Sequence, residues 1–314
     1  MLFTRLLAAA SLSAALFTST LAQGQEAANG PIAGLGPTGP VTKVQGNFKF
    51  LEGPAADGAG NLVFTDIPEN KIHKLDAAGK ITVFRDGSNH TNGTMFNANG
   101  ELYGCEMDGR IVAMNAKGEV VRVISDGYEG KRYNAPNDLV IDAHGGVYFT
   151  DPHFRAPEPL PQGKTAVYYA SADGKVARLV DDLKAPNGVI LSPDEKTLYV
   201  IPSQQAEMMA YDVTSPGKLG PGRVFCTLQQ PARKQGTGGD GLTVDVKGNL
   251  YITSGLGLQV YDPAGKLLGI IKVPEQPANC TFGGPENKTL FATCRTSLYS
   301  VPMEIAGHVF AKAK

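Results

Sequence analysis

The chain has 314 residues, of which 42% are hydrophobic, so it is long enough to bury a large core without a partner. Its 38 glycines and 21 prolines are spread along the whole chain, a distribution typical of many short strands joined by tight turns. The formal net charge is −1 and no long basic or acidic run occurs, so nucleic acid and membrane surfaces are excluded as expected partners.

The N-terminus is predicted to be a signal peptide over residues 1–22. Arg5 precedes the apolar run 6–17, and the small residues that end at Ala22 form a suitable cleavage site. The run is too short to span a bilayer, and no later segment resembles a span. We therefore expect an exported protein, periplasmic or secreted. Residues 23–40, rich in Gly, Ala and Pro, are predicted to be a flexible lead-in.

One phrase then recurs six times: a small polar or acidic residue, a few spacers, and an alternating apolar strand. We call the first apolar residue of each strand the anchor. The anchors are Leu62, Leu102, Val147, Leu198, Leu250 and Leu290. Their spacings of 40, 45, 51, 52 and 40 residues are typical of propeller blades. The sequence thus predicts one all-β domain over residues 41–314, a six-bladed β-propeller.

Each repeat continues with further strands and turns, and no long stretch has helical spacing. In the first repeat, strand 72–75 leads to the turn Asp76-Ala-Ala-Gly79 and then to strand 81–84. The segment 41–50 precedes the first repeat, while the last repeat runs short near Met303. We therefore expect the N-terminal strand to complete the final blade and to close the ring.

A polar residue lies ten or eleven positions before every anchor, at the turn that enters the innermost strand. These six residues are Glu52, Asn92, Asn137, Asn187, Asp240 and Asn279. Since innermost strands line the central channel, the six side chains are expected to converge at one mouth. Carboxylate and amide oxygens without His or Cys favour a hard cation. We predict one divalent cation, calcium, with magnesium, manganese or zinc as alternatives.

The asparagines taken singly have another interpretation, because Asn followed by Gly or Asp is a common turn dipeptide. Asn137 and Asn187 would make good turns without any metal. The two acidic members argue for the metal, since a carboxylate directed into a channel needs a partner. Asn92 and Asn279 are the members expected to contact substrate or water instead.

The phrases around these residues occur in the order found in one protein family. They are Leu51-Glu-Gly-Pro54, Lys131-Arg-Tyr-Asn-Ala-Pro-Asn-Asp-Leu139, Tyr148-Phe-Thr-Asp-Pro152, Pro186-Asn-Gly188, Asp240-Gly241 and Asn279-Cys-Thr-Phe-Gly-Gly284. With them the chain resembles the gluconolactonase branch of the SMP-30/gluconolactonase/luciferin-regenerating-enzyme-like family. The resemblance covers residues from about 50 to 300.

The resemblance implies a six-bladed propeller that hydrolyses a small lactone, a sugar lactone being the expected substrate. It assigns metal ligands to Glu52, Asn187 and Asp240, and makes Asn137 a fourth ligand or a substrate contact. It also makes Asp240 the general base, or the nucleophile in the phosphotriesterase branch of the family. Family members often carry Trp near these motifs, whereas this chain has none.

Further polar residues are expected at the mouth, where they would bind the hydroxyls of a sugar. The predicted substrate contacts are Asn92, Asn137, Asn279, His90, Arg132 and His153. For both histidines, an exposed loop position without a role is the alternative.

Two other functions stay open at this point. The same metal could serve a phosphotriester or aryl-ester hydrolase, which would favour an apolar, aromatic mouth. A calcium ion could instead stabilise a propeller that only binds a partner, because fold does not decide function. Neither the oligomeric state nor the natural substrate is predicted.

The four cysteines fit no zinc motif. An oxidising compartment permits a disulfide between Cys280 and Cys294 on neighbouring strands, and buried free thiols are the alternative.

Overall fold

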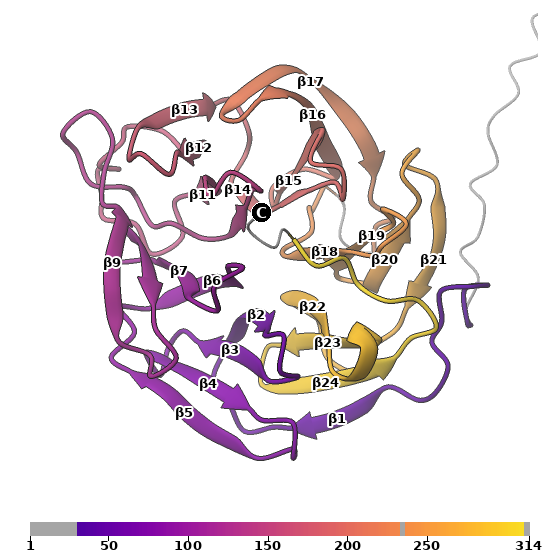
Figure 1. Ribbon diagram of the computed structural model, residues 1–314. Coiled ribbons are helices and arrows are strands. Elements are labelled where there is room, and N and C mark those ends of the chain that lie inside the picture. Colours follow the sequence, from indigo (N-terminus) through magenta and orange to yellow (C-terminus); the bar gives the residue numbers. More distant parts are fainter. Residues whose placement is uncertain (1–29, 233–235, 311–314) are drawn as a thin grey trace, which may run out of the picture.

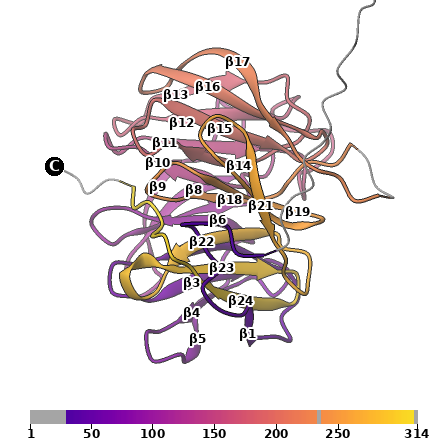
Figure 2. The same ribbon diagram turned by 90° about the vertical axis from the view of Figure 1, so that its right-hand side faces the viewer.

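The computed structural model describes residues 30–232 and 236–310. These residues form six four-stranded antiparallel sheets arranged around a central axis (Figure 1). In the side view the strands run roughly along this axis, so each innermost strand has one end at either face (Figure 2). The prediction of a six-bladed β-propeller is confirmed. The predicted signal peptide, residues 1–22, lies outside the described residues.

The chain builds the blades in sequence order, from the centre outwards in each. The first contains β2 (Leu51–Ala56), β3 (Leu62–Asp66), β4 (Lys71–Leu75) and β5 (Ile81–Asp86). The second contains β6 (Thr91–Phe96), β7 (Leu102–Glu106), β8 (Arg110–Met114) and β9 (Val120–Ser125). The third contains β10 (Leu139–Ile141), β11 (Val147–Asp151), β12 (Ala166–Ala170) and β13 (Val176–Val180).

The remaining blades follow the same plan. The fourth contains β14 (Pro186–Leu191), β15 (Thr197–Pro202), β16 (Glu207–Ser215) and β17 (Lys218–Thr227). The fifth contains β18 (Leu242–Val244), β19 (Leu250–Ser254), β20 (Gly257–Tyr261) and β21 (Leu267–Ile271). The sixth contains β22 (Asn279–Gly283), the short 3₁₀ helix η1 (Pro285–Asn287), β23 (Thr289–Cys294), β24 (Ser297–Pro302) and β1 (Thr42–Gln45).

The ring closes as the sequence predicts. β1, from the N-terminal side of the first blade, pairs antiparallel with β24, and Thr42 lies opposite Ser300. The sixth blade is therefore built from both ends of the domain (Figure 1). This pairing covers the edge that β24 would otherwise expose.

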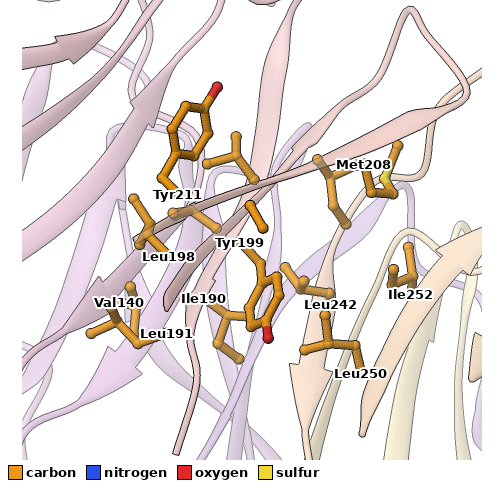
Figure 3. Packing of buried hydrophobic residues seen from close by; sticks show 14 of the residues in the cluster. Val140, Ile190, Leu191, Leu198, Tyr199, Met208, Tyr211, Leu242, Leu250 and Ile252 are labelled. Carbon is orange, nitrogen blue, oxygen red and sulfur yellow. The ribbon is translucent and has the colours of Figure 1, made fainter. Parts of the chain in front are cut away.

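The six anchors occupy equivalent places in the fold. All lie in the second strand of a blade, and each is at most 1% exposed. Around the fourth blade, Leu198 packs among side chains from both neighbouring blades, including Val140 and Leu242 (Figure 3). Because each sheet is covered on both faces, an apolar residue recurs at this position in every repeat.

In the first five repeats, the polar residue that opens the phrase caps the turn between the first two strands, whereas the sixth repeat has Gly284 at this place. Asp57 Oδ1 accepts hydrogen bonds from the backbone N–H groups of Ala59 and Asn61, at 2.9 and 2.8 Å. Asp245 Oδ1 does the same for Lys247 and Asn249. A short polar side chain that bonds the backbone a few residues on favours a tight turn, which explains the repeat.

Residues 30–40 differ from the flexible lead-in that their composition predicts. Ile32 and Leu35 are buried against the sixth blade. The backbone N–H of Thr38 donates to Pro302 O at 2.9 Å. Two apolar side chains thus fix this Gly- and Pro-rich segment, which composition alone does not reveal.

The four cysteines are buried free thiols, one of the two states that the sequence left open. Cys280 lies opposite Ala292 and Cys294 lies opposite Ser297, so the two thiols do not face each other in register. No helix among residues 30–232 and 236–310 is long and apolar enough to cross a membrane.

Candidate metal centre and active site

A cavity of about 670 Å³ opens at one end of the central channel. Five of the six predicted ring residues line it: Glu52, Asn92, Asn137, Asn187 and Asp240. The first four are 3–5% exposed, and Asp240 is partly exposed. We call these five residues the floor of the cavity. They come from five successive blades, so the repeat brings together residues far apart in the sequence.

The backbone of the floor is held by hydrogen bonds between neighbouring blades. The N–H of Gly93 donates to Asn137 O at 2.7 Å, and the N–H of Gly188 donates to Asp240 O at 3.0 Å. Glycine is required at position 188, because a Cβ there would lie 2.6 Å from Asp240 O. Neighbouring innermost strands can approach this closely only where the side chain is absent.

Buried threonines in the second strands form further hydrogen bonds between neighbouring blades, which the sequence did not lead us to expect. Thr65 Oγ1 donates to Asn92 O at 3.1 Å, and Thr150 Oγ1 donates to Asn187 O at 2.6 Å. Both threonines lie three residues after an anchor, and each reaches the floor residue of the next blade. The recurrence of Thr at this offset is the signal that could have identified them.

An acidic residue follows each of these two threonines and fixes the segment that enters its own blade. Asp66 accepts hydrogen bonds from the N–H groups of Lys49 and Phe50, at 3.0 and 3.1 Å. Asp151 accepts them from Asn134 and Ala135, at 2.9 and 2.8 Å. The two carboxylates therefore fix the backbone just before Glu52 and just before Asn137.

Asn187 orients the carboxylate of Asp240. Its Nδ2 donates to Asp240 Oδ1 at 2.6 Å and to Ser203 Oγ at 2.9 Å. Ser203 Oγ in turn donates to Gly239 O at 3.0 Å. With Nδ2 used in this way, the amide oxygen of Asn187 stays available to a ligand.

Three carboxyl groups lie close together here: Glu52 is buried and Asp240 partly exposed at the floor, and Asp138 is buried behind it. Burial, together with the charge of Asp240, raises the pKa of Glu52 well above its usual value. Burial also raises the pKa of Asp240 to about 6, although the hydrogen bond from Asn187 opposes this. The pKa of Asp138 rises to about 7 by burial, which outweighs a hydrogen bond from Leu139. Such a group of carboxylates calls for a compensating positive charge.

The donors of the floor fit a hard cation. Asn92 Oδ1 is buried and has no hydrogen-bond partner among the described residues. Buried polar atoms are rarely left unpaired, so this oxygen calls for a ligand. The described residues contain no cluster of three or more His, Cys, Asp or Glu suited to a metal. Two carboxylates and three amides are instead an all-oxygen set, which is the kind that Ca²⁺ accepts.

Asn279, the sixth ring residue, does not line this cavity. Its Oδ1 accepts a hydrogen bond from the N–H of Cys280 at 2.8 Å, and its side chain acts to lower the pKa of Glu52 and of Asp138. It lines a second cavity of about 390 Å³ that lies towards the other end of the innermost strands. Asn279 therefore lies behind the floor, between the two cavities.

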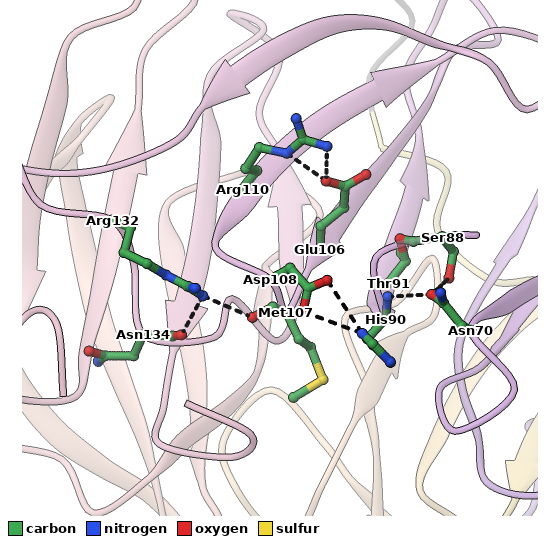
Figure 4. A network of polar contacts seen from close by, with 10 residues as sticks. All are labelled: Asn70, Ser88, His90, Thr91, Glu106, Met107, Asp108, Arg110, Arg132 and Asn134. Carbon is green, nitrogen blue, oxygen red and sulfur yellow. Dashed lines mark hydrogen bonds and ion pairs between the residues drawn. The ribbon is translucent and has the colours of Figure 1, made fainter. Parts of the chain in front are cut away.

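The three basic residues predicted to bind substrate are not brought to the cavity either. His90 Nδ1 lies 3.3 Å from Asp108 Oδ1 (Figure 4). Arg132 donates to the carbonyl oxygens of Tyr133, Asn134 and Met107. The ring of His153 lies against that of Phe154 at a tilt of 49°, with ring centroids 4.8 Å apart. Arg132 thus supports the backbone of the loops around the mouth.

Apolar residues take the place expected for these polar groups. Phe50, Ile67, Met107 and Phe154 line the cavity on the side of the first three blades. They belong to one cluster, in which Ile67 and Met107 are buried and both phenylalanines are half-buried. We call these four residues the apolar wall. The mouth is therefore less polar than the sequence predicts.

Comparison with known proteins agrees with this architecture. Residues 50–296 match the model of the SMP-30/Gluconolactonase/LRE-like region. A gluconolactonase of Zymomonas mobilis is 29% identical over 294 residues, which cover 85% of this chain and 82% of that protein. The lactonase drp35 of Staphylococcus haemolyticus is 29% identical over 246 residues, covering 75% of this chain and 73% of that protein.

Solved structures show the same fold. A gluconolactonase from Xanthomonas campestris superposes with a TM-score of 0.77 at 32% identity, covering 84% of this chain and 89% of that one. A calcium-binding protein, regucalcin, from Agrobacterium tumefaciens superposes with a TM-score of 0.74 over 91% of this chain and 98% of that one. Its identity of 21% shows the fold alone. The likeness to lactonases supports lactone hydrolysis, and the chain belongs to the SMP-30/gluconolactonase/LRE-like family.

Proposed function

We propose that this protein is a lactonase that works with one divalent cation held by Glu52, Asn137, Asn187 and Asp240. The observation that carries the proposal is the floor of the cavity, where two carboxylates and three amides face one space. The similarity to a gluconolactonase and to lactonase drp35 supports a cyclic ester as the substrate.

The cation is proposed to be Ca²⁺, because every donor is a hard oxygen and the ring is not closed by His or Cys. Magnesium, manganese and zinc are the alternatives to be tested. When bound, such a cation supplies Lewis-acid polarisation of an ester carbonyl. Asn92, whose buried Oδ1 lacks a partner, is an additional oxygen at the same place.

Asp240 is proposed to be the general base. Asn187 occupies Oδ1, so Oδ2 is the oxygen that takes a proton from an attacking water molecule. The water oxygen bonds to the carbonyl carbon, the ring C–O bond breaks, and the proton passes to the leaving ring oxygen. The product is an open hydroxy acid.

Two alternatives follow from particular observations. The apolar wall favours an aryl ester or phosphotriester more than a polar mouth would. A purely structural calcium site, in contrast, would be closed by protein atoms. Asp240 is partly exposed and faces a cavity of about 670 Å³, which supports a site that admits substrate.

Hydrolysis of glucono-1,5-lactone and of unsubstituted δ-valerolactone by metal-stripped protein, followed in a pH-stat, tests the proposal. Ca²⁺, Mg²⁺, Mn²⁺ and Zn²⁺ are then added back separately. Activity that returns with a cation, and is missing in Asp240→Asn, is the expected result. A protein that binds the cation but opens no lactone would instead be an esterase of another class or a binding propeller.

We also propose, from the sequence of residues 1–22 alone, that the protein is exported to the periplasm or beyond. Expression of the full chain should yield a protein that begins at Gln23, as measured by intact mass. A retained N-terminus in the cytoplasmic fraction would contradict this.

A further inference from the structure

Hydrogen bonds hold the backbone of the apolar wall at Phe50, Ile67 and Met107. The N–H of Ile67 donates to Phe50 O at 3.2 Å, and Phe50 is itself held by Asp66. The carbonyl of Met107 accepts a hydrogen bond from Arg132 at 3.4 Å, so this loop is held as well (Figure 4). A surface fixed in this way is ready to receive a ligand without reordering.

The wall offers no side-chain donor or acceptor to a sugar hydroxyl. Across the cavity, the hydroxyl protons of its serine and threonine residues are already donated within the protein. Ser203 donates to Gly239 O, Ser254 to Gly257 O and Thr237 to Gln230 Oε1. Among the described lining side chains outside the floor, free N–H donors remain on Arg155 and Gln276, which are both exposed.

A polyhydroxylated lactone would therefore place several hydroxyls against the apolar wall. Hydroxyls that lose water without gaining a partner weaken binding. An apolar substituent on the same ring would bury its surface against the apolar wall, and this burial strengthens binding. The cavity, at about 670 Å³, is also larger than a bare six-membered lactone requires.

We propose that the preferred substrate is a lactone whose ring carries an apolar group, an alkyl chain or an aryl ring, that lies on Phe50, Ile67, Met107 and Phe154. This inference rests on the proposed lactonase function and names its substrate class. It replaces the sugar lactone expected from the sequence, because four of the six residues assigned to substrate, Asn279, His90, Arg132 and His153, do not line the cavity.

Three δ-lactones with one ring size test the inference in the cation-loaded protein. δ-Valerolactone has no substituent, δ-octalactone has a propyl group at C5, and glucono-1,5-lactone has hydroxyls and a hydroxymethyl group. We expect kcat/KM for δ-octalactone to exceed that for δ-valerolactone by about 30-fold, which corresponds to about 2 kcal/mol at 1.4 kcal/mol per factor of ten. Glucono-1,5-lactone should be the poorest of the three.

Variants of the wall separate this effect from general hydrophobic preference. Phe154→Ala should reduce the ratio of δ-octalactone to δ-valerolactone activity about tenfold, while Phe154→Leu restores most of it. Val83→Ala, which shortens an exposed apolar residue of β5, should leave the ratio unchanged.

Higher kcat/KM for glucono-1,5-lactone than for δ-octalactone would overturn the inference and leave the lactonase function established. A ratio that Phe154→Ala does not change would do the same. The absence of turnover on all three lactones would overturn the proposed function itself, and the inference with it.

Discussion

Asn187 Nδ2 lies 2.6 Å from Asp240 Oδ1, so an amide of the fourth blade holds a carboxylate of the fifth. The same amide bonds Ser203, whose hydroxyl donates to the carbonyl of Gly239, the residue before Asp240. The carboxylate and the backbone that carries it are therefore fixed from one side. A base whose position is set by its neighbours does not need to reorganise during the reaction.

Asp240→Asn tests this arrangement most directly. An amide cannot accept the proton of the attacking water, so we expect kcat to fall about 10²–10⁴-fold. Asn has the same size and can keep a hydrogen bond to Asn187, so the melting temperature should change by only a few degrees. Asp76→Asn is the matched control, because Asn115 already fills the equivalent turn in the next blade. A kcat for Asp240→Asn within threefold of the parent would remove Asp240 from the mechanism.

Glu52→Gln should change cation binding and intrinsic stability in opposite directions. The loss of a carboxylate weakens Ca²⁺ binding, so the rise in melting temperature on adding Ca²⁺ should shrink. For the parent, saturation at 100 times Kd corresponds to about 2.7 kcal/mol. The metal-free variant should be at least as stable as the metal-free parent, because the buried carboxylate of Glu52, which lies beside the charge of Asp240, is gone.

Differential scanning calorimetry with and without Ca²⁺ measures both quantities. Glu129→Gln, which changes an exposed carboxylate, serves as the control. Equal Ca²⁺-dependent stabilisation of parent and Glu52→Gln would place the cation elsewhere.

Gly188→Ala should damage the site through the backbone. The added Cβ would lie 2.6 Å from Asp240 O, so the two strands would have to move apart. The 3.0 Å hydrogen bond from the N–H of Gly188 to Asp240 O would then be weakened. We expect a loss of about 1–3 kcal/mol in the free energy of unfolding and at least a tenfold loss in kcat/KM. Denaturant unfolding and lactone hydrolysis measure the two effects.

Gly58→Ala is the comparison for this variant, because a Cβ at Gly58 meets no atom within 4 Å. If Gly188→Ala matched Gly58→Ala in both stability and activity, the close contact between the two blades would not matter.

The stability that ring closure gives the fold should depend on pH through Glu275. This carboxylate, in the loop before β22, receives hydrogen bonds from side chains of both closing strands. The donors are Lys43 Nζ at 3.2 Å, Thr296 Oγ1 at 3.0 Å, Ser297 Oγ at 2.5 Å and Tyr299 OH at 3.1 Å. Burial acts to raise the pKa of Glu275, but these hydrogen bonds outweigh it and lower the pKa to about 2.

A carboxyl group with a lowered pKa stabilises the folded state when ionised. This stabilisation is complete above the unfolded value, near 4.5, and is lost as the pH falls towards 2. Glu275→Gln should therefore cost about 1–3 kcal/mol at pH 7 and much less at pH 3. Urea unfolding at both pH values measures this. Glu304→Gln, at an exposed position, should show no such difference, and a deficit of Glu275→Gln that stays constant with pH would contradict the prediction.

The sequence by itself determined the number of blades, the closure and five residues of the floor. It could do so because a repeat places equivalent residues at equivalent points. Leu62 and Leu250 are buried for the same reason, and Glu52 and Asp240 enter the channel at the same step of their blades. Positions fixed by local periodicity can be read without knowing any distant contact.

Only the tertiary structure decided what surrounds the floor. The direction of a loop side chain depends on segments far away in the sequence, as when Arg132 turns to the carbonyl of Met107 instead of the cavity. The burial of Leu35 likewise depends on strands β22 to β24 of the last blade, which begin at Asn279, 244 positions later. Contacts of this kind leave no period in the sequence, so the apolar wall, and with it the nature of the substrate, became visible only when the blades were assembled.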